Sequence, residues 1–236
     1  MNAGPAPPDR GCHHPAVRAE EPEYEEDYAA WRESRWPPLI ALAVGAALYA
    51  TLPGSLILGG GWLRWIIPAL LVVLMVVSAV QPVAESDRRR HVGIALVVLI
   101  TLANASAIAL LIHGIVGASG FEGRYLVISA VQVWFTNVIV FSLWFWEIDG
   151  GGPRHRAIDQ PRPHDFLFAQ YQVPEPWTWR PKYLDYLYVS ITNSTSFAPA
   201  DALPMRHRMK ALMAVESLLS VLVIIVVLAR AVSILD

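Results

Sequence analysis

The chain has 236 residues, of which 55% are hydrophobic and only 16% are charged. Soluble domains carry about 25% charged residues, so too few charges remain to cover a water-exposed surface, and the abundance of aliphatic side chains excludes a disordered chain. The single cysteine excludes a disulfide framework, and the net charge of −2 gives no indication of nucleic-acid binding.

Residues 1–35 form a polar N-terminal segment that we expect to be a disordered tail, because residues 20–27 are strongly acidic. Cys12, His13 and His14 are adjacent in this tail. Such a triplet is a weak signal for a metal ion, and we expect neither a metal site nor a cofactor.

Five long apolar runs follow the tail. Each run offers a stretch of uncharged residues, and a helix of about 20 such residues crosses a hydrocarbon core of roughly 30 Å. Backbone groups in a bilayer must bond to one another, which favours helices over isolated strands. The runs predict an all-α, multi-pass protein of the cell membrane, surrounded by lipid, with helices over 38–58, 65–84, 92–117, 125–147 and 207–233.

Uncharged polar residues lie inside the third and fourth predicted helices. We expect them to form hydrogen bonds with neighbouring helices, because a polar group in lipid needs a partner. They are Thr101, Asn104, Ser106 and His113 in the third, and Gln132, Thr136 and Asn137 in the fourth. Small residues four apart, Ala41 with Gly45 and Ala103 with Ala107, predict close helix contacts.

A long polar connection, residues 148–181, follows the fourth helix. It begins with the helix-breaking cluster Gly150 to Pro153. His164 and Asp165 are adjacent in it, but no third residue completes a catalytic group, so we interpret the pair as loop polarity. No nucleophile elbow or phosphate-binding loop is found, and we do not expect an enzyme.

The last 55 residues fall into three pieces: a short aromatic helix over 182–194, a polar turn over 193–201, and a long helix over 206–233. The short helix cannot span a bilayer, which indicates a re-entrant pore helix. Glu216 is an acid within the last span, with Ser220 one turn later on the same face. Glu216 either has a pore, cavity or interface role or pairs with Lys210 or an arginine.

This stretch resembles the pore domain of the potassium-channel superfamily, which has an outer helix, an aromatic pore helix, a T-T-V-G-Y-G-D filter, a proline and an inner helix. The segment from Thr195 to Asp201 aligns with the filter without a gap, and Pro204 aligns with the proline. The resemblance implies a pore-domain-like region over 121–236, with 125–147 as the outer helix, after a three-helix membrane region over 36–120.

The filter itself departs from the family. Ala198 and Ala200 replace both filter glycines, and Pro199 replaces the tyrosine. Proline fixes φ and alanine disfavours the unusual backbone angles that a carbonyl filter needs, so potassium cannot be selected in the usual way. Side-chain oxygens and a ring of Asp201 carboxylates could line the pore instead. The filter-like, pore-lining candidates are Asn193, Ser194, Thr195, Ser196, Phe197, Ala198, Pro199, Ala200 and Asp201.

Two functions remain open. The first is a channel-like homotetramer permeable to cations, with monovalent ions as candidates. The second is a non-conducting membrane scaffold that binds a partner. The sidedness is open too: five spans would put 15 of the 18 Lys and Arg residues on the side of the N-terminus, which makes the polar turn cytoplasmic, whereas the resemblance implies the opposite.

Overall fold

In the computed structural model the chain divides into two units, residues 1–32 and residues 33–236. The structure describes residues 34, 36–59, 62–80, 86–116, 123–157, 164–172, 179–196, 198 and 201–235. The acidic stretch 20–27 and the Cys12-His13-His14 triplet lie outside these residues.

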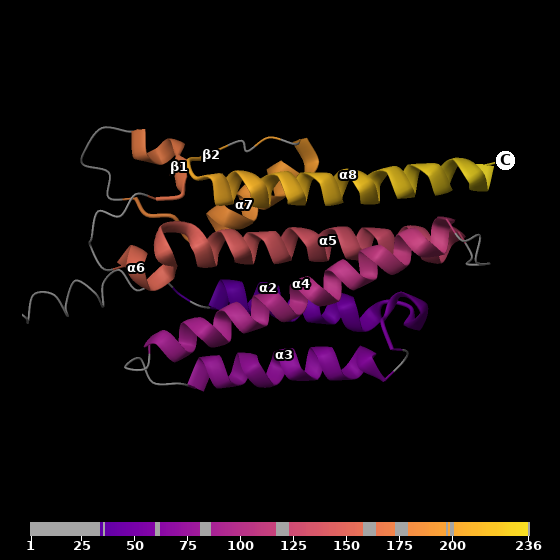
Figure 1. The fold of residues 1–236 in the computed structure, drawn as a ribbon, viewed down its shortest axis with the longest axis horizontal. Coiled ribbons are helices and arrows are strands. Elements are labelled where there is room, and N and C mark those ends of the chain that lie inside the picture. The colour runs from indigo at the N-terminus through magenta and orange to yellow at the C-terminus, as the bar shows by residue number, and fades with distance from the viewer. Residues whose placement is uncertain are drawn as a thin grey trace, which may run out of the picture. The chain divides into compact units, whose positions relative to one another are not determined.

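Five long helices make up most of the described chain (Figure 1). Helix α5 is central, because it contacts α2, α4, α7 and α8, whereas α3 packs against α2 and α4. The five helices are α2 (Trp36–Thr51), α3 (Leu63–Val80), α4 (Ser86–Val116), α5 (Gly123–Ile148) and α8 (His207–Leu235).

Three of the described helices are long and apolar enough to cross a membrane, over Arg90–Gly114, Tyr125–Gly151 and His207–Ala229. This confirms a mostly helical protein with membrane-spanning character. Helix α2 has 16 residues and is about 24 Å long, which is less than a full hydrocarbon core. The prediction of a helix over 38–58 was therefore wrong at its end, because Pro53 and Gly54 stop α2 and a 3-10 turn, η1 (Gly54–Leu56), follows.

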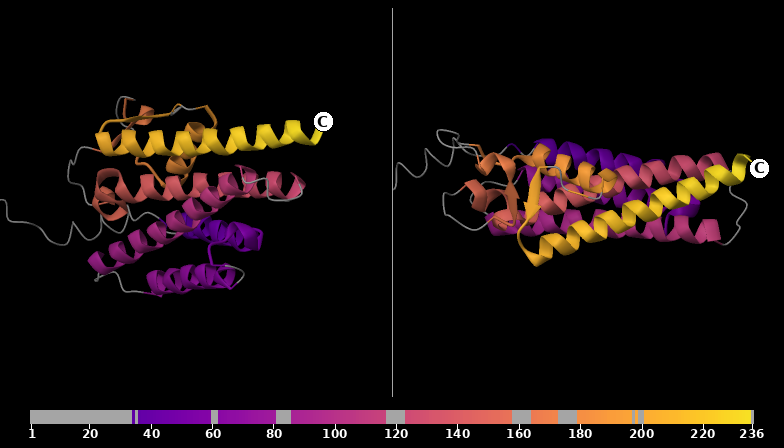
Figure 2. Two further views of the ribbon diagram at one scale, coloured as in Figure 1. Left: turned by 45° about the vertical axis from the view of Figure 1, so that its right-hand side comes forward. Right: turned by 90° about the horizontal axis from the view of Figure 1, so that it is seen from above.

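Successive helices run in alternate directions. Arg64 at the start of α3 donates to the carbonyl of Leu52, just beyond the end of α2. Thr51 bonds Gln132 near the start of α5, so α2 begins at the end of the bundle where α5 stops. Figure 2 shows the same arrangement from two further sides.

The helices pack closely at the positions of the small residues that the sequence analysis identified. Ala41, Ala103 and Ala107 are buried. A side chain at Gly45 would meet Ile100 at 2.8 Å, so this glycine lets α2 approach α4 closely. The prediction of close helix contacts at these positions is confirmed.

The connection between α5 and α8 is structured in its described parts. It contains η2 (Asp149–Gly151), α6 (Pro153–Ala157), β1 (Phe166–Phe168), η3 (Ala169–Gln172), α7 (Tyr183–Ser196) and β2 (Ala202–Pro204). Strands β1 and β2 pair antiparallel, with Phe166 opposite Pro204 and Phe168 opposite Ala202. The all-α prediction thus needs correction by one small sheet, which forms because Phe166 and Phe168 point into the aromatic core.

Candidate functional site

Helix α7 packs against both α5 and α8. Its start is fixed locally, because Asp185, in the third helical position, accepts a hydrogen bond from the backbone of Lys182 at 2.6 Å. That contact satisfies a free N–H group at the helix start, where a negative charge is also favoured. Burial raises the pKa of Asp185 above its ordinary value, while the Lys182 bond lowers it by less.

The path of α7 can be followed through its contacts with α5. Near its start, Tyr186 donates to Asp149 at the end of α5. One turn later, Ser190 lies 2.8 Å from the carbonyl of Val138. Helix α7 has 14 residues and is about 21 Å long, at 1.5 Å per residue. The chain then returns, since the backbone of Met205 donates to the carbonyl of Asp165, whose own backbone donates to Asp149.

Four of the predicted filter residues belong to the last turn of α7, and they divide into two faces. Asn193 and Ser194 are buried, whereas Thr195 and Ser196 are exposed. The prediction of a single turn over 193–201 is therefore corrected in its first part. Thr192 and Thr195 donate to carbonyls of α7 itself, so their hydroxyls are bonded within the helix.

The remaining filter candidates are less completely described. Ala198 is exposed, and Phe197, Pro199 and Ala200 lie outside the described residues. Asp201 is half-buried and accepts a hydrogen bond from Gln170 at 3.2 Å.

Glu216 on α8 is fully buried and faces α7. Its Oε2 accepts from Asn193 at 2.7 Å, and its Oε1 accepts from Ser194 at 3.0 Å and contacts Ser190. The alternative of a pair with Lys210 or an arginine was wrong, because every partner that the structure gives this carboxyl is a neutral side chain of α7. Ser220 is also buried and accepts from Asn137 at 3.4 Å.

The predicted hydrogen bonds between helices are confirmed for Thr101, Asn104, Gln132 and Asn137. They are not confirmed for Ser106 and Thr136, whose hydroxyls donate to carbonyls of their own helices. Asn104 on α4 donates to Asn137 on α5 at 3.1 Å. Trp144 on α5 donates to Thr101 on α4 at 2.9 Å. Together with the contact from Asn137 to Ser220, these bonds tie α4, α5 and α8 into one polar line through an apolar interior.

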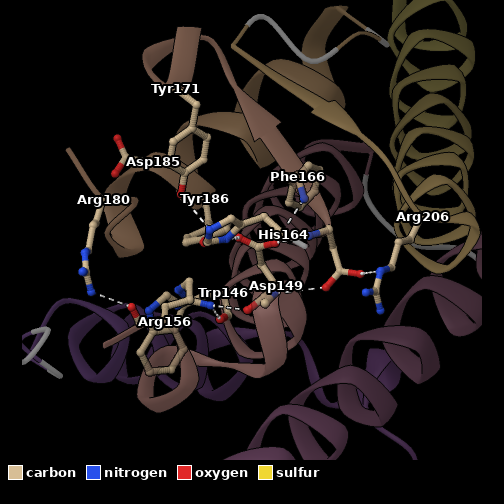
Figure 3. A network of polar contacts seen from close by, with 12 residues as sticks. Trp146, Asp149, Arg156, His164, Phe166, Tyr171, Arg180, Asp185, Tyr186 and Arg206 are labelled. Atoms are coloured by element: carbon tan, nitrogen blue, oxygen red, sulfur yellow. Dashed lines mark hydrogen bonds and ion pairs between the residues drawn. The ribbon is translucent and has the colours of Figure 1, made fainter. Parts of the chain in front are cut away.

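A second polar cluster, which we name the end network, lies where α5 stops (Figure 3). Asp149 and Asp165 at its centre are both fully buried. Asp149 accepts from the backbone of Asp165 at 2.7 Å, from the backbone of Phe166 at 3.1 Å and from the Tyr186 hydroxyl at 2.6 Å. One carboxylate thereby holds the long connection and α7 at the end of α5.

Asp165 joins the same region to the start of α8. Arg208 binds it with two nitrogens, at 2.9 and 2.5 Å, and Arg206 lies 3.2 Å away. Gly150 donates its backbone N–H to Oδ2 of this carboxylate at 3.1 Å, the oxygen that Arg208 also binds. Gly150 has a φ of +59°, a conformation that a side chain would strain. The interpretation of His164 and Asp165 as loop polarity is therefore wrong for Asp165.

Arg156 caps the end of α5. It donates to the carbonyls of Trp146 at 2.8 Å and Asp149 at 2.7 Å, at the helix end where the regular hydrogen-bond ladder stops. Its guanidinium also lies 5.0 Å from the centre of the Tyr186 ring, a cation–π distance. Sequence reasoning missed this network, although the Gly150 to Pro153 cluster marked its position.

Among the described residues, no group of three or more His, Cys, Asp or Glu side chains is arranged to hold a metal ion. In the comparisons with known proteins, no family model, curated protein or solved structure matches the chain. The candidate site is therefore defined by its geometry alone. It consists of the polar C-terminal end of α7, the contact of α7 with Glu216, and the end network that holds the start of α7.

Proposed function

We propose that this chain is a multi-pass membrane protein with five membrane helices and one re-entrant helix, and that four copies form a cation-permeable pore. The observation that carries the proposal is the path of α7. The helix starts at the end network, its 14 residues give a length of about 21 Å beside α5, and the chain returns to the same end. A polar helix end at that depth needs either protein or water around it.

The exposed side of α7's last turn supports a water-filled path. Thr195 and Ser196 present hydroxyl groups there, and the C-terminal end of a helix carries a partial negative charge that attracts cations. Asn193 and Ser194 are buried and donate hydrogen bonds to Glu216, so they do not line the proposed path. Thr195, Ser196 and Asp201 remain as the residues that would contact an ion.

An exposed apolar surface on α7 and α8 supports association of several copies. Side chains on α7 and α8 are exposed along most of both helices, although these helices pack tightly within the chain. Such a surface meets either lipid or another subunit, and one pore loop per chain requires several chains around an axis. The exposed apolar residues are Leu184, Tyr188 and Ile191 on α7, and Val215, Leu218, Leu222 and Ile225 on α8.

The alternative is a non-conducting scaffold, and one observation favours it. Asp201 already accepts a hydrogen bond from Gln170, and β2 is paired with β1, so the returning segment is held within its own chain. In this alternative α7 fills a groove between α5 and α8 and conducts nothing.

A flux experiment separates the two functions. Purified protein in liposomes should pass K⁺ or Na⁺, and Thr195→Cys should make that flux sensitive to a charged, water-soluble thiol reagent. Tyr188→Cys, on the exposed side of the same helix but nearer its start, is the matched control and should be much less sensitive. If no cation or anion tested passes the membrane and the protein has a monomeric mass in detergent, the pore is refuted and the scaffold function remains.

A further inference from the structure

The contact between Glu216 and α7 has an unusual chemical composition. Glu216 is fully buried, and the groups that reach it are the hydroxyls of Ser190 and Ser194 and the amide of Asn193. In the part of the chain that the structure describes, no ion pair includes this carboxyl. A buried carboxyl without a cation is costly unless hydrogen bonds replace its water, so three neutral donors from one helix form a specific site for it.

These three donors lie on one face of α7. Ser190, Asn193 and Ser194 are at positions i, i+3 and i+4, which are neighbours on a helix surface. Asn193 also donates to the carbonyl of Met213 at 3.0 Å, and Ser217 donates to Asn193 at 3.2 Å, so α8 contacts this face over about one turn. The contact therefore fixes both the rotation of α7 about its axis and its depth beside α8.

We infer that Glu216 is a positioning residue, whose carboxyl holds the last turn of α7 so that Thr195 and Ser196 face away from α8. This inference rests on the proposed function, since it assigns the direction in which the ion-contacting hydroxyls point. Glu216 itself does not contact the ion. It acts through Ser190, Asn193 and Ser194, and its loss frees the end of α7 to rotate or fray.

The chemistry predicts a graded series of variants. Glu216→Ala removes the carboxyl partner of Asn193 and Ser194 and one of the two acceptors near Ser190, whose hydroxyl also lies 2.8 Å from the carbonyl of Val138. Glu216→Gln keeps one oxygen for Ser190 and Ser194 but turns an N–H₂ group toward the amide of Asn193, so one contact of the three is lost. Ser220→Ala is the matched control, because Ser220 is equally buried one turn later on α8 but bonds Asn137 on α5 instead of α7.

Hydrogen exchange of the full-length protein in detergent micelles tests this directly. We expect amides of residues 191–196 to exchange at least tenfold faster in Glu216→Ala, a few-fold faster in Glu216→Gln, and within twofold of the wild type in Ser220→Ala. Amides of α4 should be unchanged in all three. If Glu216→Ala unfolds, the comparison of Glu216→Gln with Ser220→Ala remains decisive. Equal exchange at 191–196 in Glu216→Gln and Ser220→Ala would overturn the inference.

A flux measurement on the same proteins separates this inference from the proposed function. In liposomes, Glu216→Gln should change the ratio of K⁺ to Na⁺ flux at least twofold, while Ser220→Ala should leave it within experimental error. A wild type that conducts nothing refutes the pore, whereas the exchange result still decides whether Glu216 positions α7. A conducting wild type whose flux ratio is unchanged by Glu216→Gln contradicts the positioning role.

Discussion

Buried carboxyls occur in two regions of this molecule, and their partners differ. In the end network, Asp149 and Asp165 are held by backbone N–H groups, a tyrosine and two arginines. In the middle of the bundle, Glu216 is held by serines and an asparagine alone. Arginines at the end can keep part of their surface in water while they bind Asp165, whereas an arginine in the middle would have to lose its own hydration. Position along the bundle thus decides which donors a buried acid receives.

The largest effect should come from Asp149. Asp149→Ala leaves the backbone N–H groups of Asp165 and Phe166 and the hydroxyl of Tyr186 buried without an acceptor. Because each unsatisfied buried donor costs about 1–3 kcal/mol, we expect a loss of about 3–5 kcal/mol. Unfolding in mixed micelles with increasing dodecyl sulfate, followed by tryptophan fluorescence, measures this loss.

Asp149→Asn provides the matched control for that experiment. It keeps one carbonyl oxygen for the two backbone donors, and its amide can donate to the Tyr186 hydroxyl, so the expected loss is about 1–2 kcal/mol. Equal stabilities for Asp149→Ala and for a change at exposed Lys182 would show that the end network does not hold the connection to α5.

A smaller effect should distinguish the two arginines. Arg208 binds Asp165 with two nitrogens and Arg206 with one, and both side chains are about half exposed. We expect Arg208→Gln to cost about 1–2 kcal/mol and Arg206→Gln less than about 1 kcal/mol. The same micelle unfolding at low and high salt measures both variants. The reverse order would mean that the bidentate geometry is not what secures the start of α8.

A small effect, comparable to those of the arginines, should come from Tyr183, whose hydroxyl contacts α5. Its hydroxyl is 2.8 Å from that of Ser142, and burial raises its pKa to about 12. Since the folded value exceeds the ordinary value of 10, stability is full below pH 10 and falls as the pH rises toward 12. Tyr183→Phe should cost about 1 kcal/mol at neutral pH and lessen this alkaline loss.

Absorbance at 295 nm during an alkaline titration follows the ionisation of tyrosines directly. Tyr171, whose pKa burial also raises to about 12, gives the comparison variant Tyr171→Phe. A titration of wild type and Tyr183→Phe with the same profile above pH 10 would contradict the assignment.

The helices were predictable from the sequence because they depend on local properties. Uncharged apolar runs located all five long helices, and Pro53 marks where the first one stops. The hydrogen bonds of Asn104, Asn137 and Thr101 were predictable in kind, since polar groups among apolar helices need partners. Their exact partners were not, because these depend on the rotation of each helix, which no short segment of sequence determines.

The candidate site was predictable only in part. The short helix and Glu216 were identified from their pattern, but the end of α7 and the partners of Glu216 were not. Asn193 and Ser194 were predicted as filter residues because the alignment ignores the direction of side chains, whereas a helix places successive side chains about 100° apart around its axis. The end network joins residues 149, 165 and 208, whose distance in sequence leaves no local signal.

The pairing of β1 with β2 has a consequence for the motion of α7. Phe168 and Ala202 are held side by side, so the intervening segment is tied at both ends. Helix α7 then behaves as a tethered ligand for the groove between α5 and α8, with an effective concentration set by its short tether instead of by diffusion. Modest contacts are enough to keep such a ligand bound, and after any release it rebinds at the same place because its base has not moved.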